Sequence, residues 1–268
     1  MMIRKVLMLT TAALTISGCV DDDAGDESID EATMVTHPDE DVAGSQIQIH
    51  EGVDAPVVES LVARTAGMDV SGYQGSVNWG AAYANGARFA YIKATEGTGY
   101  KNPSFSQQYT GSYHAGIIRG AYHFALPNVS SGAAQANFFV DHGGGWSRDG
   151  KTLPPAIDLE YNPYGATCYG KSASSMVAWI RDFSNTIKAR TGRDAVFYTS
   201  TSWWSQCTNN NGTFGIHPLW IPRYGSSVGA LPASWSYQTI WQNADHGVFP
   251  GDHDLFNGAV DRVKAFAL

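Results

Sequence analysis

The chain has 268 residues, of which 43% are hydrophobic and 16% charged, and its formal net charge at pH 7 is −8. Acidic residues number 25 against 17 lysines and arginines, so the clustered basic face of a nucleic-acid-binding protein is not expected. No G-x-G-x-x-G follows an expected strand and no P-loop occurs, which argues against dinucleotide and nucleoside-triphosphate chemistry.

The N-terminal residues have the pattern of a secretory signal peptide. Arg4 and Lys5 precede an apolar run that ends near Ile16 and is too short for a membrane-spanning helix. The run closes in Ile16-Ser17-Gly18-Cys19, which resembles the lipobox of bacterial lipoproteins. This resemblance implies a signal peptide over residues 1–18 and a lipid on Cys19, which anchors an exported protein to a membrane without a span. An ordinary signal peptide with an unrelated cysteine is the alternative.

Residues 19–65 are expected to form an acidic, disordered tether. Between Val20 and Ala66 there are thirteen acidic residues, a single basic residue, Arg64, and no Phe, Trp or Tyr. Such a segment buries little apolar surface, and repulsion between its charges keeps it extended. Residues 67 to 268 carry 12 acidic and 14 basic residues, so the acidity belongs to the tether. The remaining domain, 66–268, is close to neutral and long enough for one sizeable core.

Two cysteines remain besides Cys19, namely Cys168 and Cys207. In an exported protein such a pair predicts a disulfide, which here would tie the loop after one strand to the loop after a later strand. Two isolated cysteines without a matching histidine pattern do not indicate a metal site.

The pattern of the domain alternates between strand and helix. Strands are expected at 66–71, 88–95, 117–125, 154–163 and 195–200. A helix is expected to start at 77–79, and further helices are expected at 103–115, 130–142 and 172–190, the last ended by Gly192. A short capped turn around Trp203 follows, and then strands at 219–224, 237–242 and 252–256 with no space for helices between them. This order predicts an α/β fold with a parallel sheet closed into one TIM-like barrel whose last helices are eroded. An open doubly wound sheet is the alternative.

An acidic pair stands in the central strand. Asp158 and Glu160 are two positions apart, so they project to one side of the strand while Ile157 and Leu159 project to the other. Their Cα atoms should lie ~6.6 Å apart, a range at which one charge raises the pKa of its neighbour and keeps a general acid protonated. The simpler interpretation is a strand end whose acids are solvated or paired with basic side chains.

Polar and aromatic side chains stand at all eight expected strand ends, where barrels of this kind carry their active sites. They are Asp69, Glu96, Tyr122, His123, Asp158, Glu160, Tyr198, Arg223, Tyr224, Trp241, Gln242 and Asp254. Carboxyl groups combined with flat aromatic faces suit glycoside hydrolysis. A metal at His123 or at Asp252-His253-Asp254 lacks any supporting ligand spacing, so no metal and no cofactor are expected.

Several sequence blocks together resemble the family 25 glycoside hydrolases, the Ch-type lysozymes. They are the blocks Met68–Gly75, Tyr91–Gly97, Arg119–Phe124, Ile157–Glu160, Leu219–Ile221 and Trp241-Gln242. The resemblance implies a flattened barrel of five β/α units plus three strands, (β/α)5(β)3. It also implies cleavage of the β-1,4 bond between N-acetylmuramic acid and N-acetylglucosamine in peptidoglycan.

Carried over by position, the resemblance makes Glu160 the general acid, Asp158 its partner across the sugar, and Asp69 a further acid of the rim. The fourth acid is placed at Asp254, with Asp252 left open as the alternative. The side chains expected to bind substrate are Tyr73, Glu96, Tyr122, His123, Tyr198, Tyr224, Trp241 and Gln242.

The sequence leaves the course of the reaction open between retention, inversion and attack by the substrate's own 2-acetamido group with Asp158 orienting it; the third is favoured. Two other functions stay open: a chitinase or N-acetylhexosaminidase, and a wall-binding module without turnover. The expected partners are peptidoglycan glycan strands and, through Cys19, a membrane, for a protein that acts as a monomer.

Overall fold

The computed structural model describes residues 42–52 and 63–268, and these contain a closed barrel of eight strands. The barrel strands are β1 (Thr65–Val70), β2 (Phe89–Glu96), β4 (Ile118–Phe124), β5 (Ala156–Asp158), β6 (Val196–Tyr198), β7 (Leu219–Pro222), β8 (Ile240–Ala244) and β9 (Asp252–Phe256). Neighbours from β1 through β8 are parallel, whereas β9 pairs antiparallel with both β8 and β1 and closes the ring. The short β3 (Tyr100–Lys101) forms a hairpin on β2.

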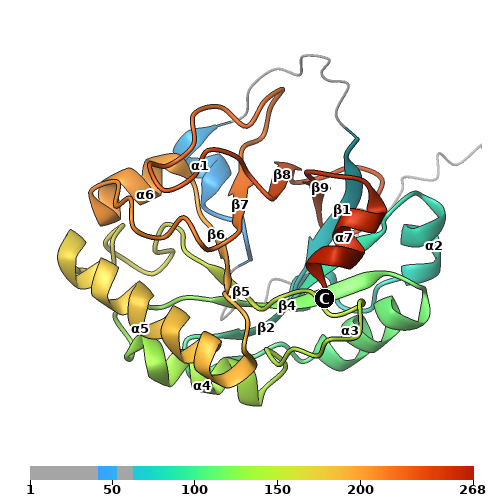
Figure 1. The fold of residues 1–268 in the computed structure, drawn as a ribbon, viewed down its shortest axis with the longest axis horizontal. Coiled ribbons are helices and arrows are strands. Elements are labelled where there is room, and N and C mark those ends of the chain that lie inside the picture. The colour runs from blue at the N-terminus through green and yellow to red at the C-terminus, as the bar shows by residue number, and fades with distance from the viewer. Residues whose placement is uncertain (1–41, 53–62) are drawn as a thin grey trace, which may run out of the picture. The chain divides into compact units, whose positions relative to one another are not determined.

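Helices lie outside the barrel, with α3, α4 and α5 along the lower edge in Figure 1. They are α1 (Ile47–Glu51), α2 (Trp79–Ala84), α3 (Phe105–His114), α4 (Gly132–Asp141), α5 (Ala173–Thr191), α6 (Thr201–Thr208) and α7 (Val260–Phe266), with a 3-10 turn at Gly72–Gln74. Ser131, Ser172 and Ser200 cap the starts of α4, α5 and α6, each accepting a backbone N–H in the first turn. The α/β barrel predicted from the sequence is therefore confirmed.

Local predictions fail where tertiary structure overrides the pattern. The turn expected around Trp203 is the helix α6, because Ser200 caps it and Trp203, Trp204 and Cys207 bury one of its faces. Helix α7 was not predicted, and β8 begins at Ile240 rather than at 237. The expectation of an all-parallel sheet is wrong for β9, because the connection 245–251 is too short for the crossover that a parallel strand needs.

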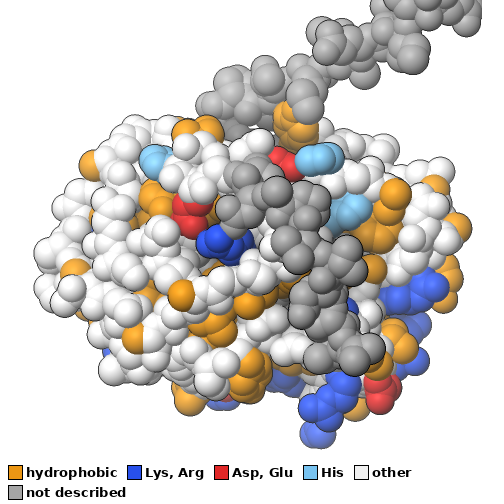
Figure 2. All heavy atoms as spheres, turned by 90° about the horizontal axis from the view of Figure 1, so that it is seen from above, with side chains coloured by type: hydrophobic (Ala, Val, Ile, Leu, Met, Phe, Trp, Pro, Cys, Tyr) orange, Lys and Arg blue, Asp and Glu red, His pale blue; other side chains and the backbone are white. Residues whose placement is uncertain are grey.

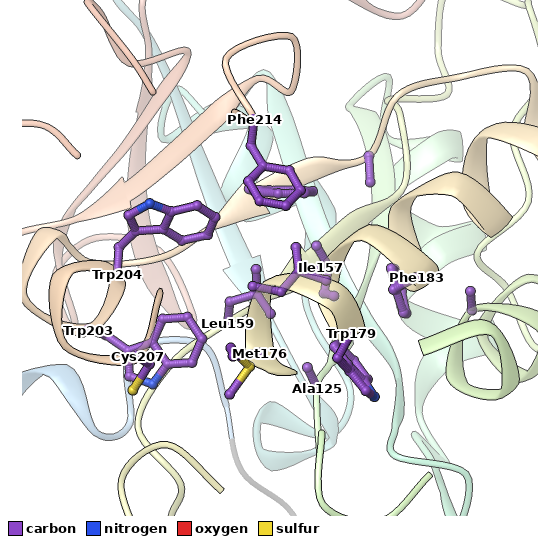
Figure 3. Packing of buried hydrophobic residues seen from close by; sticks show 14 of the residues in the cluster. Ala125, Ile157, Leu159, Met176, Trp179, Phe183, Trp203, Trp204, Cys207 and Phe214 are labelled. Carbon is purple, nitrogen blue, oxygen red and sulfur yellow. The ribbon is translucent and has the colours of Figure 1, made fainter. Parts of the chain in front are cut away.

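Two apolar layers flank the barrel wall. Inside it, Tyr91, Tyr122, Tyr198 and Trp220 pack together with Phe89, and all five are fully buried. Outside it, the strands pack against the helices, as Figure 3 shows for β5 beneath α5. These two layers give each strand one face that points inward and one that points outward.

The outer layer determines how β5 is oriented. Ile157 and Leu159 are buried against Met176 of α5 and belong to the same cluster as Trp203 and Trp204 of α6 (Figure 3). The regular strand is only three residues long, against the 154–163 predicted. The alternation nevertheless continues past its end, because the N–H of Leu159 still bonds to the carbonyl of Tyr198 at 2.9 Å.

The predicted disulfide joins Cys168, in the turn after β5, to Cys207 on α6, with the two Cα atoms 5.3 Å apart. It closes a separation of 39 residues and ties the turn after β5 to the helix that follows the neighbouring strand β6. The face seen in Figure 2 consists mostly of uncharged side chains and backbone, in agreement with the near-neutral charge of the domain.

The expectation that 19–65 is a solvated tether is wrong for residues 42–52. These residues form a turn and the helix α1, in which Ala43 and Ile47 are buried. Average composition conceals them, because a few small and apolar residues suffice to bury a short segment.

The signal peptide and Cys19 lie outside the described residues, and none of the described helices is long and apolar enough to cross a membrane.

The contact between α4 and α5 provides a test of the fold. A Cβ on Gly132 would overlap the backbone carbonyl oxygen of Trp179 and lie 2.5 Å from the backbone nitrogen of Phe183. We expect Gly132→Ala to lower the free energy of unfolding by about 1–3 kcal/mol, because backbone of α5 has to move.

Gly145→Ala is the matched control, since its Cβ would have nothing within 4 Å. Urea denaturation of both variants measures the difference. Equal stability of the two variants would show that α4 and α5 do not pack as closely as described.

Candidate active site

Asp158 and Glu160 project into the barrel. The two residues that alternate with them, Ile157 and Leu159, are held outward beneath α5, and both carboxylic acids are almost completely enclosed. Backbone bonds on both sides fix the position, since the carbonyl of Asp158 accepts the N–H of Ala125 at 3.1 Å. The acidic pair therefore lies on the inner wall, as its spacing predicted.

Gln242 organises the opposite wall. Its Nε2 donates to Oδ2 of Asp69 at 2.9 Å and to Oδ2 of Asp252 at 3.0 Å. Its Oε1 accepts the hydroxyl of Tyr198 at 2.8 Å and that of Tyr224 at 3.0 Å. One amide of β8 thus holds two carboxyl groups and two phenols from four other strands or strand ends in a fixed arrangement.

Asp254 lies two positions further along β9. Its Oδ1 accepts the indole N–H of Trp220 at 2.8 Å, and its side chain is buried. In the β1–β9 register Asp252 is opposite Asp69, whereas Asp254 is opposite Gly67. Because β9 is antiparallel, its first residue, and not its last, lies at the rim formed by the ends of the parallel strands.

Ionisable groups on the two walls affect each other's pKa values. Burial raises the pKa of Tyr198 far above its usual value, and the charges of Glu160, Asp158 and Asp69 raise it further. Burial likewise raises the pKa of Tyr224, with Asp252, Glu160 and Asp69 acting in the same direction. The acidic residues from both walls therefore share one space, and we call this set the acid cluster: Asp69, Asp158, Glu160, Asp252 and Asp254.

Burial controls protonation within the acid cluster. Burial raises the pKa of Asp69 to about 7, although hydrogen bonds from Gln242 and Asp254 pull it down. The pKa values of Asp252 and Asp254 are also raised, by burial first and by the charge of Asp69 second. Carboxylic acids held protonated near neutral pH are a feature of acid–base sites.

Two predicted substrate-binding residues point away from the acid cluster. His123 lies between the barrel and the helices, where its ring nitrogens bond Thr95 and Gln135 at 2.8 and 3.0 Å and burial lowers its pKa to about 3. Trp241 lies on the outer face of β8, with its indole N–H donated to the carbonyl of Arg223. Both assignments are wrong for one reason: their strand neighbours Tyr122 and Gln242 occupy the inward-facing positions.

The other predicted residues lie inside the barrel, at the end of a strand or at the surface. Tyr122 is part of the inner layer. Glu96 is buried at the end of β2, where it pairs with Lys93 at 2.6 Å and accepts the hydroxyl of Tyr164 at 2.6 Å beside a surface pocket. Tyr73 follows β1 directly and is partly exposed in the 3-10 turn. Arg223 is exposed, and its carbonyl holds Trp241.

Sequence reasoning missed Trp220 and Tyr164. Trp220 bonds Asp254 and stacks on Tyr91 with a centroid separation of 4.9 Å. The alternation of Leu219 and Trp220 along β7 contained the signal, since only one of them could face inward. Tyr164 lies in an irregular turn, so no periodicity could have indicated its contact with Glu96.

Metal ligation has no support in the described ranges 42–52 and 63–268, where no group of three or more His, Cys, Asp or Glu side chains is arranged to hold an ion. His253 projects opposite to Asp252 and Asp254, and its Nε2 accepts the N–H of Phe249 at 3.1 Å. The motif Asp252-His253-Asp254 therefore does not gather its three side chains around one point.

Comparison with known proteins identifies a matching family model and similar relatives. The model of "Glycosyl hydrolases family 25" matches residues 68–252. Lysozyme M1 of Streptomyces globisporus is 46% identical over 86% of this chain and 82% of its own, and the N,O-diacetylmuramidase of Chalaropsis sp is 52% identical over 75% of this chain and 98% of its own. The structure of a family GH25 lysozyme from Aspergillus fumigatus superposes with a TM-score of 0.75 at 49% identity, covering 76% of this chain and 99% of that one.

The raised pKa of Asp69 predicts how stability depends on pH. Because the folded state binds the proton more tightly than the unfolded state, this contribution to stability is complete below about pH 4 and is lost as pH rises through about 7. The side chain introduced by Asp69→Asn cannot ionise. Between pH 4 and pH 8 we therefore expect the free energy of unfolding of this variant to rise by a few kcal/mol relative to that of the parent chain.

Thermal melts across this range measure the effect, and Asp261→Asn, at an exposed acid of α7, is the control. A parent and an Asp69→Asn variant that change in parallel with pH would contradict the assignment.

Proposed function

We propose that this chain, which belongs to glycosyl hydrolase family 25, hydrolyses the β-1,4 bond between N-acetylmuramic acid and N-acetylglucosamine in peptidoglycan. It is a glycoside hydrolase, and the observation that carries the proposal is the buried pair Asp158 and Glu160 facing Asp69 across the inside of the barrel. Two facing sets of carboxyl groups supply both a proton donor and a negative charge, the two requirements of glycosidic cleavage.

In this proposal Glu160 is the general acid. It donates its proton to the glycosidic oxygen as the bond from that oxygen to C1 breaks, and later accepts a proton from the attacking water. Asp158 orients the 2-acetamido group of the sugar, whose carbonyl oxygen attacks C1, and its charge stabilises the positive charge that develops. Gln242, Tyr198 and Tyr224, held to each other, present polar atoms from one side.

The fourth acid is assigned by register. Sequence reasoning placed it at Asp254 with Asp252 as the alternative. Asp252 lies opposite Asp69 at the rim and shares the amide of Gln242, while Asp254 lies deeper and receives the indole of Trp220. We therefore propose that Asp252 faces the substrate and that Asp254 supports Asp69 from beneath.

For location, we propose export and a lipid on Cys19, based on the lipobox-like end of the signal peptide. Mass spectrometry of the mature N-terminus tests this directly, since diacylglycerol on Cys19 gives a characteristic added mass.

The acid role predicts the effect of Glu160→Gln. This change keeps the shape of the side chain and removes the proton, so we expect cleavage of purified sacculi to fall by about 10³-fold or more, with a thermal melt close to that of the parent. Asp158→Asn should be similarly severe, whereas Asp141→Asn on the surface should be neutral.

Mass spectrometry of the released fragments reports both the bond that is cut and the new reducing end. Substantial activity in Glu160→Gln would remove this residue from the acid role. Release of products from chitin but none from sacculi would replace the proposed substrate with an N-acetylglucosamine polymer.

The acetamido route predicts retention of configuration. Attack on C1 by the carbonyl oxygen of the acetamido group, followed by attack of water from the opposite face, inverts the centre twice. Proton NMR of a reaction sampled within its first turnovers should show the β-anomer of the new reducing sugar before mutarotation. An α-anomer formed first would exclude this route and favour direct attack by water.

A further inference from the structure

Residues 42–52 lie on the acid cluster. The backbone N–H of Gly44 donates to Oε1 of Glu160 at 3.0 Å, and the N–H of Ala43 approaches the hydroxyl of Tyr122 at 3.4 Å. From the other wall, Nε2 of Gln242 lies 3.4 Å from the carbonyl oxygen of Ala43. One peptide unit, Ala43–Gly44, therefore contacts both walls at once and is buried between them.

The fit depends on the absence of a side chain at Gly44. A Cβ at this position would overlap the hydroxyl of Tyr224 and lie 2.7 Å from Oε1 of Gln242 and 3.1 Å from the hydroxyl of Tyr198. Gly44 also has φ of +88°, a conformation that other residues rarely adopt. The segment thus enters the cluster at a residue that presents only backbone.

The rest of the segment is held beside the cluster. Ile47 is buried in the apolar layer that includes Leu159 and Trp203. His50 stacks on Tyr161 with a centroid separation of 4.0 Å and an interplanar angle of 10°. Oε1 of Glu51 accepts the hydroxyls of Tyr161, at 2.9 Å, and of Ser200. Figure 1 shows α1 beside α6 and β7, where these contacts gather.

We propose that residues 42–52 are an intramolecular inhibitor that occupies the substrate-binding side of the acid cluster. The inference rests on the proposed function, because the blocked groups are those assigned to glycan cleavage. The amide of Ala43–Gly44 presents an N–H to Glu160 and a carbonyl oxygen to Gln242, the same two groups that the acetamido group of a sugar offers. A glycan strand and the segment cannot occupy this space together.

Covalent attachment makes a weak contact effective. A segment joined to the barrel by a short linker has an effective concentration on the order of millimolar, far above that of a free peptide. Substrate must compete with the segment for the site. The apparent Kd for glycan is therefore the Kd of the open site divided by the fraction of chains in which the site is open. The site becomes fully available only when the segment leaves.

Gly44→Leu in the full chain is the decisive variant, because it changes no residue of the barrel. The side chain cannot enter the cluster, so we expect the segment to be expelled and the rate of sacculus cleavage at low substrate to rise about tenfold or more. Gly52→Leu is the matched control: Gly52 also has positive φ, +74°, but its Cβ would have nothing within 4 Å. Both variants carry the backbone strain of a side chain at positive φ, so exclusion from the cluster is what separates them, and this control should cleave at a rate much closer to that of the parent.

Hydrogen exchange with mass spectrometry reports occupancy independently of turnover. Peptides that cover 42–52 should be protected in the parent and in Gly52→Leu and unprotected in Gly44→Leu. A synthetic peptide of residues 42–52, added to Gly44→Leu, should raise KM and leave kcat unchanged, whereas the same peptide with leucine at position 44 should have no effect.

Failures of the two proposals are distinguishable. Loss of protection in Gly44→Leu without a gain in cleavage, or no protection in the parent, would overturn the inhibitor. If no chain cleaves sacculi, the proposed function fails, and co-sedimentation with sacculi then decides the inference. Stronger binding by Gly44→Leu than by Gly52→Leu would support a blocking segment, and equal binding would overturn it.

Discussion

The burial of Ile157 and Leu159 beneath α5 is the constraint on which the site depends. A strand gives every second residue to each face, so fixing these two side chains in the outer layer sends Asp158 and Glu160 into the barrel. A shift of one residue in the register would exchange the two sets, placing carboxyl groups in an apolar layer at a cost of several kcal/mol each. The acidic pair is therefore positioned by the hydrophobic layer behind it rather than by any partner within the site.

Gln242 performs the corresponding task on the other wall by means of hydrogen bonds. Its amide has both donors and an acceptor, so it can bind two carboxyl groups and two phenols simultaneously, which neither a carboxylate nor a hydroxyl could do. Asp69 is bonded yet so thoroughly buried that its pKa rises to about 7. Desolvation prevails over the hydrogen bond because the neutral acid gives up less hydration on burial than the carboxylate does.

Sequence reasoning succeeded where a period or a motif spans an element. The barrel, the long helix α5, the disulfide and the inward-facing acidic pair each follow from alternation, helical spacing or counting. It failed at His123 and Trp241 because proximity to a strand end does not say which face a residue occupies, and adjacent residues occupy opposite faces. It failed to predict the antiparallel direction of β9. Strand direction depends on the length of the preceding connection, which can be read from the sequence, and on how the ring of strands closes, which cannot.

The segment 42–52 shows the limit of arguments from composition and also why Gly44 is informative. Thirteen acidic residues and no aromatic residue describe the average of the tether, while binding to the barrel depends on Ala43, Gly44 and Ile47, which the average hides. The barrel residues that touch the segment, Glu160, Gln242 and Tyr198 among them, are the ones assigned to the substrate, so changing them would disturb catalysis and docking together. Gly44 takes part in docking of the segment and not in catalysis. Its lack of a side chain allows the segment to enter, and altering it separates occupation of the site from the chemistry that the site performs.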